Sequence, residues 1–268
     1  MDAKKILFEK TGKSNISFTN RCNDAIKCAY NICAKMNSDC KKVLCQKEGG
    51  WMTYDQFALK MGFDVSYVDT NDSIVDLEDL KKKVSSGEYL FIIFNRIPGY
   101  FCKNDVSEIN KICHEYNVLT IEDQCAELAL TNSDFIVCSF GRWKPLNLGH
   151  GGFIASNNLL DVAIECKYPE LSSEVLPFLL NCDERVSKLK EIVLRVKKEL
   201  TDLKLNVVRP EFTELNVIVS FQDDLEKQKI LDYCALNTFE FEECPRDIRI
   251  NKKAISIEIK RMDTNETK

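Results

Sequence analysis

The sequence predicts an α/β protein, a three-layer sandwich around a mostly parallel sheet, followed by a small α+β C-terminal domain. Short β-rich runs alternate with helix-like stretches over the first two-thirds of the chain, as in βαβ units. Residues 89–94 are a continuous apolar run, which is typical of a strand buried on both faces, and residues 135–140 are expected to form another buried strand. The chain has 268 residues, 44% of them hydrophobic, enough for one large domain or one and a half domains.

Helices and strands are expected to alternate through the first two-thirds of the chain. Residues 23–36 predict a helix because apolar or small side chains recur there at a helical spacing. Asp105 is expected to cap a helix that ends near Tyr116, and Gly62 to close the helix at 53–61. A further helix is expected at 77–84, and strands at 43–45, 65–68, 89–94, 118–121, 135–140 and 153–156.

The last third of the chain departs from this alternation and predicts a separate small domain. Pro169 and Pro177 indicate a linker, and residues 183–203 a long, charged amphipathic helix. Strands are expected at 205–208 and 215–221, a helix at 224–236, and a final pair of strands before Lys260. The predicted division is 1–165 for the large domain and 166–268 for the small one.

Composition excludes several classes of function. Lys and Arg total 37 against 42 Asp and Glu, a formal charge of −5, whereas a protein that neutralises nucleic-acid phosphates is normally basic. The chain is too apolar to be disordered, and it has no apolar run long enough to cross a bilayer. Its first residues lack the apolar segment of a secretory signal. We therefore expect a cytoplasmic protein without nucleic-acid or membrane partners.

The thirteen cysteines predict reduced, mostly buried thiols. Their number is odd, many lie in apolar stretches, and no C-x-x-C pair occurs, which argues against a disulfide scaffold. His114 and His150 are the only histidines, so no metal site is predicted.

Two polar residues are expected where parallel strands end, which is where ligands bind in such sheets. Asp123 follows the strand at 118–121, and a buried carboxylate there needs a cation or a hydrogen-bond donor, although a helix-capping or loop aspartate fits equally well. Lys144 follows the next strand in small and apolar surroundings. Such surroundings can lower a lysine pKa towards neutrality, as a Schiff-base nucleophile requires; a solvated loop lysine is the alternative.

Together these segments resemble the fold-type I pyridoxal-phosphate (PLP) enzymes, nearest to the DegT/StrS-type aminotransferases that act on nucleotide-linked keto sugars. Three segments match the family's Glu-Asp, Ser-Phe-x-x-x-Lys and Gly-x-Gly-Gly motifs with unbroken spacing: Glu122-Asp123, Ser139-Phe140 to Lys144, and Gly149-His150-Gly151-Gly152. The resemblance covers residues 14–156 and implies a PLP-transferase-like large domain. It implies that Lys144 carries pyridoxal 5'-phosphate as an aldimine, Asp123 holds the pyridine nitrogen and Ser139 binds the phosphate.

The resemblance extends upstream, with departures. Trp51 lies in the family segment whose aromatic residue stacks on the cofactor ring. Cys22 and Asn23 lie at the helix start that cradles phosphate, where the family has Gly-Thr, so the usual hydroxyl is lost. The family's histidine before a glycine turn is Asn95, and its His or Gln after the aspartate is Ala126. The chain is also shorter than typical members.

The resemblance implies an amino-acid donor, a keto acceptor and a homodimer. Arg246 and Arg249 are candidate contacts for the donor carboxylate, although a surface ion pair is the more ordinary role for each. Arg142 and Trp143, which flank the lysine, could face either the pocket or a partner subunit.

Two other functions stay open at this stage. A PLP-dependent lyase or desulfurase would need a mobile nucleophilic cysteine, and Cys22 and Cys125 are the thiols nearest the predicted site. A non-catalytic PLP-fold protein would explain the lost phosphate hydroxyl, but the presence of both Asp123 and Lys144 argues for an enzyme.

Overall fold

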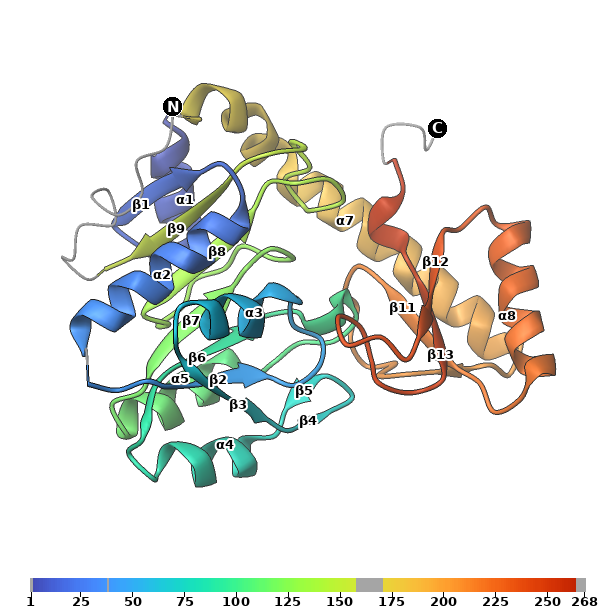
Figure 1. The fold of residues 1–268 in the computed structure, drawn as a ribbon. Helices are drawn as coiled ribbons and strands as arrows, with labels where there is room; N and C mark the ends of the chain where they lie inside the picture. The colour runs from blue at the N-terminus through green and yellow to red at the C-terminus, as the bar shows by residue number, and fades with distance from the viewer. Residues whose placement is uncertain (1, 38, 158–170, 264–268) are drawn as a thin grey trace.

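The computed structural model describes residues 2–37, 39–157 and 171–263. Figure 1 shows a large sheet at one end of the molecule and a smaller sheet at the other, joined by the long helix α7 (Ser172–Asp202). The domain boundary predicted at 165/166 and the linker residue Pro169 lie outside the described residues. Pro177 lies inside α7, so the prediction that it belongs to a linker is wrong. A proline this near a helix start removes only one backbone hydrogen bond.

The large sheet has seven strands in the order β1-β9-β8-β7-β6-β2-β3. The strands β8, β7, β6, β2 and β3 pair in parallel, while β9 is antiparallel to both of its neighbours. This confirms the predicted α/β class and the mostly parallel sheet. The strand bounds are β1 (Asn15–Thr19), β2 (Lys42–Gln46), β3 (Asp64–Val68), β6 (Tyr89–Asn95), β7 (Leu119–Asp123), β8 (Phe135–Ser139) and β9 (Gly152–Ser156).

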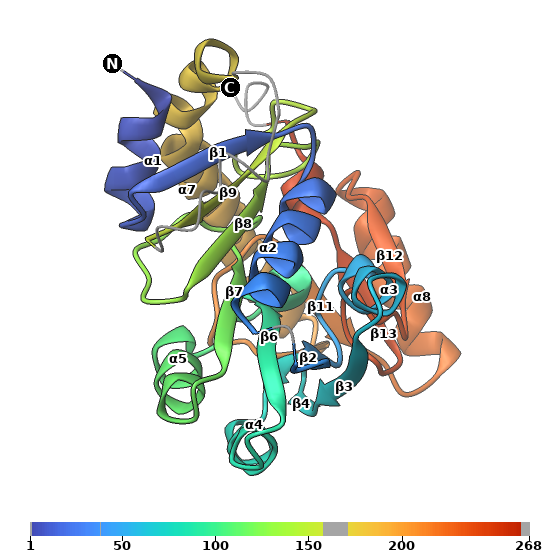
Figure 2. The ribbon, with the colours of Figure 1, turned by 60° about the vertical axis from the view of Figure 1, so that its left-hand side comes forward.

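Helices cover both faces of this sheet and make the three layers (Figure 2). One face packs against α2 and α3, and the other against α4 and α5 and, over β8 and β9, against α1 and the start of α7. Neighbouring strand residues divide between the faces: Phe91 and Ile93 contact the α2 side, Ile92 and Phe94 the α4–α5 side. The helix bounds are α1 (Ala3–Thr11), α2 (Cys22–Met36), α3 (Thr53–Lys60), α4 (Leu77–Val84) and α5 (Val106–Glu115).

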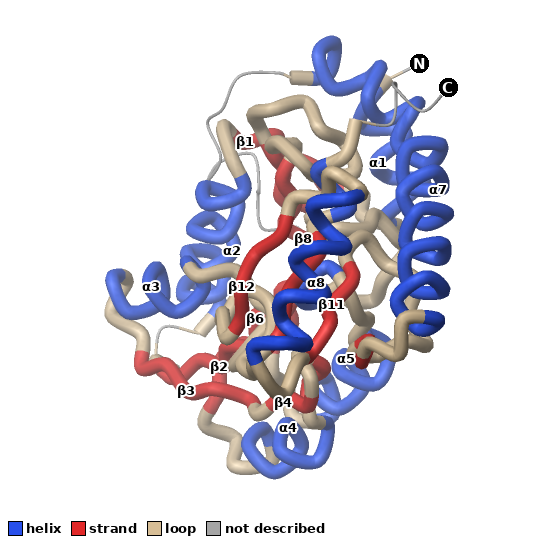
Figure 3. Tube along the Cα trace, turned by 90° about the vertical axis from the view of Figure 1, so that its right-hand side faces the viewer, coloured by secondary structure: helices blue, strands red, loops and turns tan. Residues whose placement is uncertain are grey.

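The smaller sheet is antiparallel, in the order β10-β11-β13-β12. The second half of α7 and the helix α8 pack on one face of it, as Figure 3 shows from the side. This is the predicted α+β arrangement. Its elements are β10 (Asn206–Val207), β11 (Val217–Ser220), α8 (Asp224–Leu236), β12 (Phe241–Cys244) and β13 (Ala254–Ile257).

Short elements follow some of the strands. The hairpin β4 (Thr70–Asn71) and β5 (Ile74–Val75) and the 3₁₀ turn η1 (Pro98–Tyr100) follow strands of the large sheet, and η2 (Ile259–Arg261) follows β13. Among the described residues, no helix combines the length and the apolarity that crossing a bilayer requires.

Candidate active site

A cavity of about 310 Å³ lies where β6, β7 and β8 end, at the carboxyl edge of the parallel sheet. This volume is at the lower end of the range for small-molecule sites. The structure brings all six predicted site residues to its lining: Cys22, Asn23, Trp51, Asp123, Ser139 and Lys144. The small C-terminal region contributes Ile248 and Arg249, so the cavity lies between the two sheets.

Asp123 is the last residue of β7 and is only 2% exposed. One carboxylate oxygen accepts a hydrogen bond from the Tyr54 hydroxyl at 2.6 Å, and the other accepts one from the Cys125 backbone N–H at 2.8 Å. Burial raises the pKa of Asp123 well above its usual range. Neutral donors therefore only partly compensate its burial, and a positively charged partner would stabilise the ionised form.

Lys144 lies in the turn after β8, and its ammonium Nζ donates a hydrogen bond to the Tyr100 hydroxyl. Nζ is also 5.8 Å from the centre of the Trp51 ring. Burial lowers the pKa of Lys144, but its interactions with Tyr100, Cys125 and Asp123 outweigh burial and raise it above the ordinary value. The expectation of a pKa near neutrality is therefore wrong for this arrangement, because the surroundings of Lys144 are less apolar than its sequence neighbours are.

Tyr100 is a site residue that the sequence did not indicate. Its φ is 67°, a left-handed conformation that is uncommon for an aromatic residue, and it follows Gly99 in the turn after β6. The Tyr100 carbonyl accepts hydrogen bonds from the backbone N–H groups of Leu215 and Asn216 at 2.9 and 2.8 Å. The segment just before β11 thus holds the strained turn that presents the hydroxyl to Lys144.

The start of α2 also lines the cavity and provides backbone donors. Arg21 precedes the helix and makes no side-chain capping bond within the described structure, so the first-turn N–H groups are not capped by a side chain. Gly152 lets β9 approach this helix start, because a Cβ there would lie 2.4 Å from the Cys138 carbonyl oxygen and 3.0 Å from the Cys22 nitrogen. Ser139, at the end of β8, lies in the same lining.

Trp51 and Asn23 are joined by a hydrogen bond. The indole Nε1 donates to the Asn23 side-chain oxygen at 3.1 Å, and the Thr53 hydroxyl donates to the same oxygen at 3.2 Å. Asn23 therefore anchors the aromatic ring against the helix start, although the Trp51 residue as a whole is 39% exposed.

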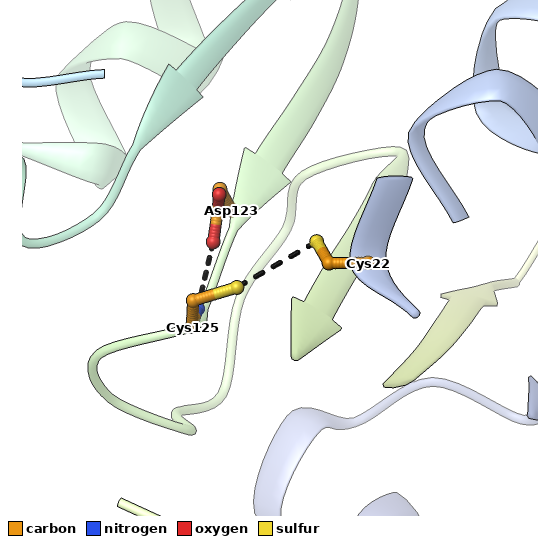
Figure 4. Close-up of side chains that lie close together, drawn as sticks. All are labelled: Cys22, Asp123 and Cys125. Atoms are coloured by element: carbon orange, nitrogen blue, oxygen red, sulfur yellow. Dashed lines mark hydrogen bonds between the residues drawn. The ribbon is translucent and has the colours of Figure 1, made fainter. Parts of the chain in front are cut away.

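Cys22 points towards Cys125, not outward. Their sulfur atoms are 3.6 Å apart, and Figure 4 shows both side chains facing one another beside Asp123. Cys22 comes from the start of α2 and Cys125 from the loop after β7. The prediction that these are the thiols nearest the site agrees with the cavity lining, which contains both.

The two arginines of the C-terminal region have different environments. Arg246 forms an ion pair with Glu242 and its side chain is 44% exposed, as expected for a surface residue. Arg249 is only 5% exposed, lines the cavity and binds Glu258 through Nε and Nη2 at 2.8 and 2.9 Å. The surface interpretation is therefore wrong for Arg249.

A larger cavity, of about 720 Å³, lies beside the first and contains neither Asp123 nor Lys144. Arg142 and Trp143 line this second cavity, together with residues of α7. The two residues that precede Lys144 in sequence thus line a different cavity from the lysine.

Two residues that contact the lysine or the aspartate were missed as functional candidates: Tyr54 and Tyr100. Arg249 was named as a candidate, but its burial was not expected. Tyr54 lies one turn beyond Trp51, and Tyr100 follows the strand at 89–95 just as Asp123 ends its own strand. The rule that ligands bind at the carboxyl ends of parallel strands could have indicated Tyr100.

Solved structures with similar folds include several transferases. The sugar aminotransferase CalS13 from Micromonospora echinospora matches with a TM-score of 0.74 and 15% identity, covering 98% of this chain and 88% of that one. Helicobacter pylori PseC, an aminotransferase involved in the biosynthesis of pseudoaminic acid, matches at 0.73 and 13%, covering 95% and 84%. A NifS-like protein from Rickettsia africae matches at 0.68 and 15%, covering 98% and 84%. At these identities the likeness establishes the fold, that of PLP-dependent transferases.

The chain belongs to the DegT/DnrJ/EryC1/StrS aminotransferase family, whose family model matches residues 5–167. Membership makes it a PLP-dependent transferase and makes pyridoxal phosphate its cofactor. A comparison with curated proteins finds no sequence that matches.

The residues of the cavity fit this cofactor. A buried carboxylate that forms no ion pair among the described residues suits a protonated pyridine nitrogen. An amine and an indole ring lie in the same cavity, and uncapped N–H groups at a helix start suit a phosphate. The helix start therefore offers backbone donors to a phosphate even without the threonine hydroxyl.

Proposed function

We propose that the protein is an aminotransferase that moves an amino group from an amino acid to a keto acceptor, with a keto sugar as the first acceptor to test, and that Lys144 is its catalytic residue. The observation that carries the proposal is the presence of Asp123 and Lys144 in the lining of one cavity. Family membership supports aminotransferase chemistry.

Pyridoxal phosphate supplies an electron sink that makes the Cα–H bond of a bound amino acid acidic. In this proposal Asp123 keeps the pyridine nitrogen protonated, and the absence of an ion pair to Asp123 in the described structure favours this role. Trp51 stacks on the ring, and Ser139 with the Cys22–Asn23 helix start binds the phosphate.

Lys144 holds the cofactor and then, as a free amine, moves a proton at the substrate Cα. Tyr100 positions the lysine through its hydroxyl. Arg249 is positioned by Glu258 and has N–H groups left to bind the donor carboxylate.

The proposal also includes a homodimer, which size-exclusion chromatography with light scattering tests. It further includes a cytoplasmic location, which the buried free thiols favour and cell fractionation tests.

The test is to load the protein with pyridoxal phosphate, reduce it with borohydride and locate the pyridoxyl adduct by peptide mass spectrometry. We expect one adduct, on Lys144, and none in Lys144→Ala. Lys252→Ala is the matched control because that lysine is on the surface, with 46% of its side chain exposed. An adduct only on another lysine would overturn the assignment.

A second measurement separates transamination from the alternatives. Glutamate added to the loaded wild-type protein should give one equivalent of 2-oxoglutarate per chain in the absence of an acceptor, and candidate keto sugars should then restore the starting spectrum. Release of sulfide or alanine from cysteine, without this half-reaction, would instead favour a desulfurase-type reaction at Cys22 or Cys125.

A further inference from the structure

Three potential metal ligands meet in the cavity: the sulfur atoms of Cys22 and Cys125 and a carboxylate oxygen of Asp123. These atoms all lie within 4.8 Å of one another, and all three residues are buried (Figure 4). The two cysteines are 103 positions apart in sequence, which is why no ligand spacing pattern reveals the cluster.

The separation of the two sulfurs fits a shared metal ion. They are 3.6 Å apart. Two sulfurs bound to one tetrahedral Zn²⁺, at about 2.3 Å each, would lie roughly 3.8 Å from one another. A disulfide would need about 2.05 Å, so the two sulfurs are not bonded to each other. In this structure the Cys125 thiol donates a hydrogen bond to the Cys22 sulfur across a distance that two ligands of one ion would also have.

The Asp123 carboxylate, which lies next to the two sulfurs, is held in place by hydrogen bonds. Its two oxygens are fixed by the Tyr54 hydroxyl and the Cys125 backbone N–H. Each carboxylate oxygen retains a lone pair for a metal, and outer hydrogen bonds of this kind are what hold metal ligands in position.

The types of ligand atom determine which metal ion the cluster would bind. Two thiolates and one carboxylate favour Zn²⁺ and disfavour Mg²⁺ and Ca²⁺, which prefer oxygen ligands. The fourth position would face the cavity that Lys144 and Trp51 also line, leaving it open to water. Binding releases the two thiol protons to solvent and involves no change of oxidation state.

We propose that the cofactor-free protein binds one Zn²⁺ ion through Cys22, Cys125 and Asp123, and that zinc and pyridoxal phosphate exclude each other. The exclusion follows because both need the Asp123 carboxylate; this second part rests on the proposed function, whereas the metal site itself does not. Zinc would then control how much of the protein can take up its cofactor.

The metal site is tested by titrating cofactor-free, reduced protein with Co²⁺, whose thiolate charge-transfer and tetrahedral ligand-field bands report the ligands directly. We expect one Co²⁺ per chain, displaced by Zn²⁺. In Cys22→Ala and Cys125→Ala we expect the thiolate band to be weakened and Zn²⁺ affinity to fall by more than roughly 100-fold, the upper end of the loss for an outer-shell partner.

Cys113→Ala and Cys182→Ala are the matched controls, because both cysteines are buried and free but are not among the three clustered ligands. These variants should bind Co²⁺ like the wild type. Absence of the thiolate band in wild-type protein, or an unchanged band in both Cys22→Ala and Cys125→Ala, would overturn the site. If a variant does not fold, native mass spectrometry of wild-type protein with Zn²⁺ still tests the site, because a chain that takes up no zinc would overturn it.

Exclusion is tested by adding pyridoxal phosphate to zinc-loaded wild-type protein and counting borohydride-trapped adducts. We expect adduct formation to be suppressed and then restored by a chelator. Zinc binding with undiminished adduct formation would overturn the exclusion but leave the proposed function intact. Cobalt binding with no adduct in metal-free protein would overturn the proposed function but leave the metal site intact.

Discussion

The structure contains two buried carboxylates near Tyr100 whose surroundings are opposite. Glu258 contacts three cations, Arg249, Lys260 and Arg261, and accepts further hydrogen bonds from Asn216 and Ser256. Asp123, within the described structure, accepts hydrogen bonds only from neutral donors. Burial opposes ionisation of both, but the arginine and lysine charges hold the pKa of Glu258 well below its usual range, whereas the pKa of Asp123 is raised.

The difference separates a structural charge cluster from a site built to bind something. Glu258 is already paired with three cations. Its two hydrogen bonds from Arg249 hold that side chain in the wall of the cavity. Asp123 forms no ion pair among the described residues, so its carboxylate is available to a pyridinium nitrogen or a metal ion. A perturbed pKa by itself would not distinguish the two residues, because structural networks perturb pKa values too.

The largest effect is expected from a substitution in the charge cluster around Glu258. Glu258→Gln should lower the free energy of unfolding by about 3–5 kcal/mol, because it leaves buried cations without their carboxylate. Folding lowers the pKa of Glu258, so its ionised form stabilises the folded protein. This stabilisation is fully present above the pKa that Glu258 has in the unfolded chain, and it is lost as the pH falls through the pKa of the folded state. Urea unfolding at neutral pH measures the loss.

Glu243→Gln is the control for that substitution. Glu243 pairs with Lys227 on the surface and is 56% exposed, so its loss should cost less than about 1 kcal/mol. Equal losses in the two variants would show that the Glu258 cluster contributes no more than a surface pair.

The next effect has the opposite direction. Asp123→Asn should leave the cofactor-free protein as stable at neutral pH as the wild type, or more stable by about 1–3 kcal/mol, because it removes a poorly compensated buried carboxylate. Since the pKa of Asp123 is raised on folding, the wild type should lose stability as pH rises from the unfolded pKa towards the folded one, and the variant should lack this slope.

Urea unfolding at two pH values, near 5 and near 8, measures this difference. The same variant should fail to retain pyridoxal phosphate. Destabilisation as large as that of Glu258→Gln would mean that Asp123 is already satisfied in the cofactor-free protein, and would remove the contrast between the two carboxylates.

Sequence reasoning reached the large sheet and the residues at its edge because both depend on local signals. Buried strands read as apolar runs, and Asp123 and Ser139 each end one, so their convergence follows from the topology of a parallel sheet. Matching to family motifs then supplied Trp51, Lys144 and the helix start, all of which lie in the same cavity.

The parts that escaped prediction depend on contacts between distant segments. Burial of Arg249 depends on Glu258 and on the approach of the small sheet to Tyr100, which no local pattern encodes. The helix α1 was missed because its lysine-rich sequence is only weakly amphipathic, and its apolar residues are buried by contact with the large sheet and α7. The raised pKa of Lys144 depends on the Tyr100 hydroxyl, which comes from 44 residues earlier.

A smaller effect is expected from Lys260, which belongs to the Glu258 cluster. Three cations share one carboxylate there, and burial, together with Arg249 and Arg261, lowers the pKa of Lys260 to about 8 even though Glu258 attracts it. Between that value and the unfolded pKa the unfolded chain binds more protons, so wild-type stability should rise with pH over this window. Lys260→Met should lack the rise.

The difference in unfolding free energy between wild type and Lys260→Met should therefore shift by about 1–2 kcal/mol in favour of the wild type from pH 7 to pH 9.5. Taking the difference cancels the titration of the thiols and tyrosines that both proteins share. Lys252→Met, at an exposed lysine, is the control and should show no such shift. A shift in the opposite direction would mean that the pair with Glu258 dominates over burial.

The smallest effect tests the neutral donors of Asp123. Tyr54→Phe removes one hydrogen bond to the carboxylate and should cost about 0.5–1.5 kcal/mol of cofactor binding, or at most roughly tenfold in affinity. The effect is small because the Cys125 N–H remains and because the attraction between Asp123 and a cationic ligand is unchanged. Tyr67→Phe is the control, since that hydroxyl donates to Asp55 on the surface. Fluorescence titration with pyridoxal phosphate measures both. A loss near that of Asp123→Asn would mean that the hydroxyl, and not the missing charge, is what prepares Asp123 for its ligand.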